Sequence, residues 1–139
     1  MMHFVPIPTT HEHLRASSRH WLPFLEKISK RSHESVEEML DQIAAGLVHL
    51  ALVWNDETKT ACALLGMQFR KNGDDLVGEI HWLTGRGMKE WRTLLPELKA
   101  YLKTHVGCTV IKPICRPGWE PYLKAEGFKK THIMMEMRL

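Results

Sequence analysis

Two titratable side chains with the spacing of a β-strand face are the first candidates for chemistry in this chain. Residues 76–83 alternate in polarity, which predicts a strand with Glu79 and His81 on one face and Ile80 and Trp82 on the other. A strand carboxylate can take a proton from an ammonium group, directly or through water, and imidazoles titrate near neutral pH. Glu79 is therefore the first candidate for a general base and His81 the second. In the alternative interpretation, both face solvent or a charged partner on a neighbouring strand.

Two glycines separated by one arginine follow this strand. The stretch "GRGMKEW" (residues 85–91) leads into apolar positions with helical spacing, at Trp91, Leu94, Leu95, Leu98 and Leu102. A strand, a glycine turn and a helix N-terminus can together present backbone N–H groups to a phosphate. Two interpretations stay open. Gly85 and Gly87 belong to an anion site, or they only allow a turn with positive φ while Trp91 packs in the core.

The rest of the chain predicts the elements that must position these residues. Residues 3–8 read as an edge strand or extended lead-in, and apolar residues have helical spacing over residues 14–28 and 36–47, with Ser35 in a capping box. Strands are predicted at residues 50–54, 60–70, 76–83, 108–116 and 129–139, with a short helix at 119–127. The turn sequences "NDETK" and "KNGDD" favour antiparallel hairpins. This order predicts one α/β (α+β) domain over residues 1–139, with helices on both faces of a mixed sheet.

Composition excludes several classes of function. The net charge is +3, and the basic residues are scattered, so nucleic-acid binding has no special support. Three cysteines without CxxC spacing indicate neither a disulfide framework nor a metal site, and a reducing cytoplasm is expected. No apolar segment approaches the roughly 18 residues that span a bilayer, and the N-terminus lacks the pattern of a secretion signal. The sequence predicts a soluble cytoplasmic protein without membrane partners.

The order of elements resembles that of the GNAT superfamily of acyl-CoA-dependent N-acyltransferases. The resemblance covers nearly the whole chain, but the motif residues lie in its second half: the glycine turn and Arg116, Gly118, Trp119, Gly127 and Phe128. It implies a GNAT-like mixed, mostly antiparallel sheet of about six to seven strands with helices on both faces. It also implies a cofactor, acetyl-CoA, and an acceptor that is a small-molecule amine or a protein lysine.

The resemblance carries over residue by residue only in part. In the superfamily the turn after the fourth strand holds the cofactor pyrophosphate, which implies contacts from Leu83, Gly85, Arg86, Gly87, Met88 and Lys89. Aligned on the trailing "LL", Lys89 and Trp91 replace the small residues of the motif. Aligned on the two glycines, Trp82 stands where Arg or Gln is expected. The superfamily often has a tyrosine, which protonates the departing thiolate, where this chain has Leu123, and Tyr122 lies roughly 100° further around a helix.

Two functions follow from this resemblance. In the first, the chain is an acyl-CoA-dependent N-acyltransferase that acetylates an amine, with Glu79, His81 and Tyr122 as catalytic candidates. In the second, it keeps a GNAT-like scaffold without the chemistry and serves as a binding or assembly protein, as in phage-type proteins with a similar "RPGW" stretch. The altered motif and the displaced tyrosine favour the second function. The order of elements and a carboxylate on the expected strand favour the first, which is our prediction. Nothing in the sequence indicates an oligomeric state.

Overall fold

The structure is a computed structural model, and it describes residues 1–85 and 92–139. Its strands are β1 (Met2–Pro6), β2 (His49–Asn55), β3 (Thr60–Asn72), β4 (Asp75–Gly85) and β5 (Val110–Pro113). Its α-helices are α1 (His11–Ser29), α2 (Val36–Ala44), α4 (Leu95–Tyr101) and α5 (Glu120–Ala125). Short helical turns are η1 (Arg92–Leu94), the π-helical η2 (Leu102–Val106) and η3 (Pro117–Trp119).

The strands form one sheet in the order β1-β2-β3-β4-β5. The first four are antiparallel, and β5 joins β4 in parallel. The predicted α/β class and the mostly antiparallel sheet are therefore confirmed. The predicted six to seven strands are wrong for the described residues, in which the sheet has five. Residues 129–139, predicted as the last strand, form neither strand nor helix. A strand needs a neighbour for its backbone N–H and C=O groups, and alternating polarity alone does not supply one.

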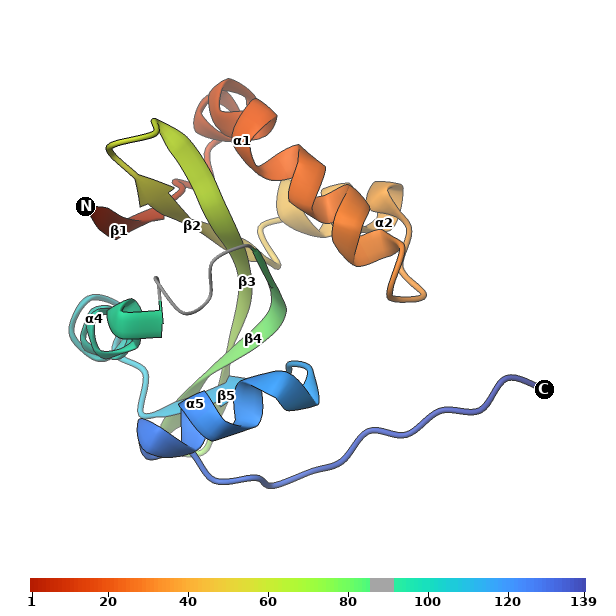
Figure 1. Ribbon diagram of the computed structural model, residues 1–139, viewed down its shortest axis with the longest axis vertical. Coiled ribbons are helices and arrows are strands. Elements are labelled where there is room, and N and C mark those ends of the chain that lie inside the picture. The colour runs from red at the N-terminus through yellow and green to blue at the C-terminus, as the bar shows by residue number, and fades with distance from the viewer. Residues whose placement is uncertain (86–91) are drawn as a thin grey trace.

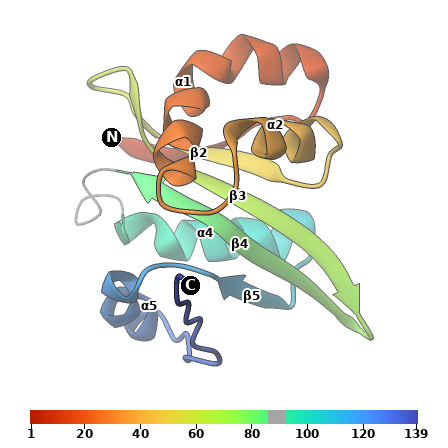
Figure 2. The same ribbon diagram turned by 90° about the vertical axis from the view of Figure 1, so that its right-hand side faces the viewer.

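Helices α1 and α2 cover one face of the sheet, as Figures 1 and 2 show. Ser35 caps α2 as predicted, because its side chain accepts a hydrogen bond from the backbone N–H of Glu38 at 3.1 Å. Trp21 and Leu25 of α1 and Met39 and Ile43 of α2 pack against strand residues in one buried cluster. Among residues 1–85 and 92–139, no helix is both long enough and apolar enough to cross a membrane.

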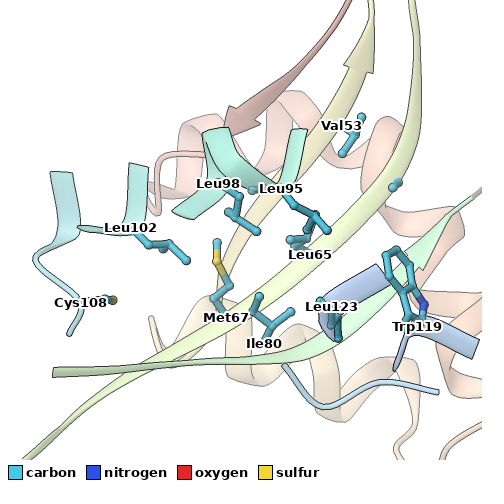
Figure 3. Close-up of a cluster of buried hydrophobic side chains, with 12 residues drawn as sticks. Val53, Leu65, Met67, Ile80, Leu95, Leu98, Leu102, Cys108, Trp119 and Leu123 are labelled. Carbon is cyan, nitrogen blue, oxygen red and sulfur yellow. The ribbon is translucent and has the colours of Figure 1, made fainter. Parts of the chain in front are cut away.

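Helix α4 covers the opposite face, and α5 packs beside it (Figure 1). Pro96 is compatible with α4 because it lies in the first turn, where its missing N–H has no helical partner. The buried cluster on this face joins strand residues to the two helices, as Figure 3 shows for Leu65, Met67, Ile80, Leu95, Leu98, Leu102, Trp119 and Leu123. The sheet is therefore buried on both faces, and β4 runs between two separate apolar clusters.

Candidate functional site

A β-bulge in β4 places the predicted catalytic residues. Ile80 pairs with Met67 and Trp82 pairs with Gly66, so His81 is one extra residue on β4. Ile80 consequently packs on the α4 side of the sheet and Trp82 on the α1/α2 side. The prediction that these two residues share a face is therefore wrong. It failed because strict alternation holds only where the strand register is regular.

The space for the Trp82 side chain comes from its partner on β3. Gly66 lies under the indole, and a Cβ atom built there would be 2.5 Å from Cε3 of Trp82. The absence of a side chain at Gly66 thus lets Trp82 lie flat on the sheet. Trp82 also donates its Nε1–H to Oε1 of Glu34, at 3.2 Å, and Gln42 donates to the other oxygen of Glu34, at 2.5 Å. The connection between α1 and α2 is therefore fixed above the bulge.

Glu79 lies on the same face of the sheet as Trp82. Glu79 pairs with Gln68 and Trp82 pairs with Gly66, and residues two apart on β3 face the same side. The Glu79 side chain is only 15% exposed, yet its carboxylate is well partnered. Nη2 of Arg70 lies 2.6 Å from Oε1, and Nε2 of His81 lies 2.8 Å from Oε2. The structure thus brings Glu79 and His81 together in hydrogen-bond contact.

Arg70 is a member of this cluster that sequence reasoning missed. Its side chain is 58% exposed, and it reaches Glu79 diagonally across the β3–β4 pair. The β3–β4 hairpin carried a sequence signal that could have identified Arg70. With Asn72 opposite Asp75, the register can be counted outward, and it brings Arg70 opposite Val77 and diagonal to Glu79. The expected alternative for Glu79, a charged partner on the neighbouring strand, is thus present together with the contact to His81.

Strands β4 and β5 separate next to the cluster. Their register ends at Ile80 and Pro113, and Ile114 adds one hydrogen bond from its N–H to the carbonyl of Ile80, at 2.8 Å. Strand β4 continues to Gly85, paired over this length with β3. The edge of β4 that faces away from β3 is thus not covered by the β5 ladder from His81 onward. The two strands separate immediately after the residues that carry the titratable side chains.

An apolar cavity lies beside the point of separation. Its volume is about 20 Å³, which is room for about one water molecule. It is lined by Leu65, Ile80, Leu83, Leu95, Leu98, Lys99, Ile111, Pro113, Trp119, Leu123 and Phe128. The predicted cofactor residue Leu83 is therefore in contact with this cavity. Packed apolar side chains nearly fill the gap between β4 and α5.

The other predicted cofactor residues divide into two groups. Gly85 ends β4 opposite Ala63, where a Cβ atom would lie 2.6 Å from the carbonyl oxygen of Cys62. Glycine is therefore required there by the approach of β3, whatever else the position does. The remaining ones, Arg86, Gly87, Met88 and Lys89, lie outside the described residues, as does Trp91, whose core packing was an alternative.

Tyr122, the third catalytic candidate, lies in α5. The next residue, Leu123, points into the α4-side core and lines the apolar cavity, while Tyr122 itself is half-buried. Tyr122 is not among the residues that line this cavity. Among the described residues, no three His, Cys, Asp or Glu side chains gather as a metal ion would require.

The whole chain is similar in structure to several acetyltransferases. An acetyltransferase from Trypanosoma brucei superposes with a TM-score of 0.67 at 13% identity, over 100% of both chains. Glucosamine-6-phosphate N-acetyltransferase from Arabidopsis thaliana gives 0.65 at 13% identity, over 99% of this chain and 98% of that one. A predicted acetyltransferase from Clostridium acetobutylicum, determined with acetyl-CoA, gives 0.64 at 12% identity, over 99% and 96%. The sequence matches no protein-family model and none of the curated proteins.

Proposed function

We propose that this chain, whose fold is that of the GNAT acetyltransferases, transfers an acetyl group from acetyl-CoA to an amine. The observation that carries the proposal is the contact of Glu79 with His81 at the β4 bulge, directly beside the separation of β4 and β5. The acceptor is a small-molecule amine or a protein lysine. The three cysteines are free, which fits action in the cytoplasm.

The residues around the separated strands are chemically suited to the pantetheine arm of acetyl-CoA. That arm is an extended chain with amide groups, and the edge of β4 from His81 to Gly85 offers backbone N–H and C=O groups of the kind that bind such chains. Leu83 and Trp119 supply apolar contact beside it. Because the cavity holds only about 20 Å³, these side chains must move when the arm binds.

Glu79 removes the proton that prevents the acceptor from reacting. Amines carry a proton at neutral pH and must lose it before the nitrogen lone pair can attack. When bound, acetyl-CoA would supply the electrophilic thioester carbonyl, and its C–S bond would break as the C–N bond forms, so that CoA leaves as the thiol. Oε2 of Glu79 receives the proton from the ammonium group, and His81, which is 32% exposed, passes it to solvent. Arg70 holds Oε1 and fixes the orientation of the carboxylate.

The experiment compares Glu79→Gln with Glu37→Gln, which changes an exposed carboxylate in the first turn of α2. CoA release would be followed with a thiol reagent over a panel of small amines and a lysine peptide. We expect Glu79→Gln to lower kcat by about 10²–10⁴-fold and to leave acetyl-CoA affinity nearly unchanged, because general-base catalysis acts on the acceptor. Glu37→Gln should behave as wild type. Equal rates for the two variants would contradict the role of Glu79.

A binding or assembly protein without catalysis is the second candidate. The observation that favours it is the small volume of the apolar cavity, about 20 Å³, which is closed by Trp119, Leu123 and Phe128 among others. Calorimetric titration of folded wild-type protein with acetyl-CoA separates the two candidates. Binding heat at millimolar cofactor supports the transferase. The absence of heat, together with no thermal shift, would support the scaffold.

A further inference from the structure

A second cavity lies between the sheet and η2, at the C-terminal end of α4. Its volume is about 350 Å³, within the range of about 300–1,000 Å³ that is usual for small-molecule sites. Phe69, Tyr101 and Val106 at its boundary pack against the α4-side cluster, whereas Glu79 lies on the α1/α2 side of the sheet. Among the described residues, none lines both this cavity, called here the η2 cavity, and the apolar cavity beside β5. The two cavities are therefore separate.

The sheet supplies one aromatic wall of the η2 cavity. His49 of β2 pairs with Met67 of β3, and Phe69 follows two residues further along β3. His49 and Phe69 are therefore diagonal neighbours on one face of the sheet. Their ring centroids lie 5.2 Å apart with the ring planes inclined by 55°. Tilted ring pairs at this separation are favourable, so the contact helps to hold both rings in place.

The helix supplies a second aromatic wall. Tyr101 ends α4 and His105 lies in η2, four residues later, so both side chains lie on one face of the helix. Their rings are stacked, with centroids 5.3 Å apart and planes inclined by 21°. The end of η2 is fixed, because the buried Leu102 accepts hydrogen bonds at its carbonyl from the N–H groups of Gly107 and Cys108. Short π-helical turns such as η2 occur frequently at functional sites.

Three polar groups belong to residues that line the η2 cavity: the imidazoles of His49 and His105 and the hydroxyl of Tyr101. Within residues 1–85 and 92–139, none of the three has a hydrogen-bond partner. Each can donate a hydrogen bond, and His49 and Tyr101 are half-buried, where a lost contact with water must be replaced. No described Asp or Glu lines the cavity, so a bound cation would lack a counter-charge there. The polar groups therefore favour a ligand with acceptor oxygens.

We propose that the η2 cavity binds a small aromatic carboxylate. The aromatic ring of the ligand contacts the His49–Phe69 and Tyr101–His105 pairs, since edge-on and offset contacts between rings are favourable. The carboxylate accepts hydrogen bonds from the imidazole N–H groups and the Tyr101 hydroxyl, and hydrogen bonds to a charged group are stronger than neutral ones. This binding site goes beyond acetyl transfer and does not depend on it, because none of its residues belongs to the Glu79 cluster.

The first test measures ligand chemistry by calorimetric titration of the wild-type chain. Benzoate and indole-3-carboxylate are the probes. Cyclohexanecarboxylate lacks the aromatic ring, and benzylamine replaces the carboxylate by a cation. We expect the aromatic carboxylates to bind at least about 10-fold more tightly than either comparison compound, a difference of about 1.4 kcal/mol. No heat from either aromatic carboxylate at millimolar concentration would overturn the proposal. Equal binding of cyclohexanecarboxylate, or tighter binding of benzylamine, would also overturn it.

The second test locates the site with variants that keep an aromatic ring. His49→Phe and His105→Phe remove the imidazole donors, and each should weaken benzoate binding by about 10-fold through loss of a hydrogen bond to a charged group. His11→Phe, at an exposed position that begins α1, is the matched control and should bind as wild type. Unchanged benzoate affinity in both cavity variants would overturn the proposal.

A third measurement does not depend on the folding of any variant. Amide chemical-shift mapping by NMR, on wild type titrated with benzoate, should show the largest changes at the start of β2, near Phe69 and in η2. The same titration in the presence of acetyl-CoA should give the same changes, because the two sites share no residue. Changes centred instead on Glu79 to Leu83 would assign the carboxylate to the region of acetyl transfer and would overturn a separate site.

Discussion

The indole of Trp82 lies so close over Gly66 that a Cβ atom at Gly66 would be 2.5 Å from Cε3 of the ring. Trp82 is 3% exposed and is held at its other end by Glu34, so the ring cannot move aside without loss. The β-bulge and the connection between α1 and α2 are therefore linked through one side chain. A substitution at Gly66 should therefore disturb both the bulge and the connection between α1 and α2.

We expect Gly66→Ala to destabilise the fold by about 1–3 kcal/mol, because it overpacks a buried site. Gly118→Ala is the matched control, since nothing lies within 4 Å of a Cβ atom there and its φ is outside the left-handed region. Urea unfolding followed by tryptophan fluorescence measures both free energies of unfolding. Equal urea midpoints in the two variants would show that Trp82 shifts without loss of stability, and would contradict this prediction.

Leu98 tests the core that joins α4 to the sheet. It was predicted as a core residue from helical spacing, and its exposure of 4% confirms that prediction. Leu98→Ala should lower the free energy of unfolding by about 2–5 kcal/mol, through lost burial and the cavity left behind. Leu47→Ala removes the same atoms from a side chain that is 60% exposed, and it should cost far less. Similar losses in the two variants would contradict the assignment of Leu98 to the core.

Burial of Cys108 should make the free energy of unfolding depend on pH in the alkaline range. Burial raises the pKa of its thiol above the ordinary value of 9.0, and Cys115 has a shift in the same direction for the same reason. The unfolded chain loses these protons first, so the stabilisation is complete below pH 9 and falls as pH rises toward the folded-state pKa values. We expect the free energy of unfolding to fall less between pH 8 and pH 10 in the Cys108→Ala, Cys115→Ala double variant than in wild type. An identical fall in both proteins would remove the two thiols as the cause.

Several helices and strands of this fold could be predicted from the periodicity of apolar residues. The strands containing Leu50, Thr60 and Leu76 and the helix capped by Ser35 are in their expected places, because apolar period and turn residues agree at each of them. The cluster around Glu79 was half predicted. Glu79 and His81 were named from their spacing, but Arg70 required the register of the hairpin, which depends on how the two strands pair in space.

Two features could not be read from the pattern of residues. The sequence around His81 alternates as a regular strand would, and only the pairing of Gly66 with Trp82 and of Met67 with Ile80 reveals the extra residue. Residues 129–139 have the composition of a strand, but strand formation is decided by the presence of a partner edge. Both features depend on contacts between segments distant in sequence.

Because His81 is the extra residue of the bulge, we expect the folded sheet to tolerate its removal. If His81 were deleted, Ile80 would still face Met67 and Trp82 would still face Gly66, and β4 would regain strict alternation between its two apolar clusters. The shortened protein should have a free energy of unfolding at least equal to that of wild type, which calorimetry would measure. Under the proposed function it should lose acetyl transfer, which the CoA-release assay would measure. Under the proposed function, the chain would then carry at this position a residue that serves the transfer of the proton and not the regularity of the sheet.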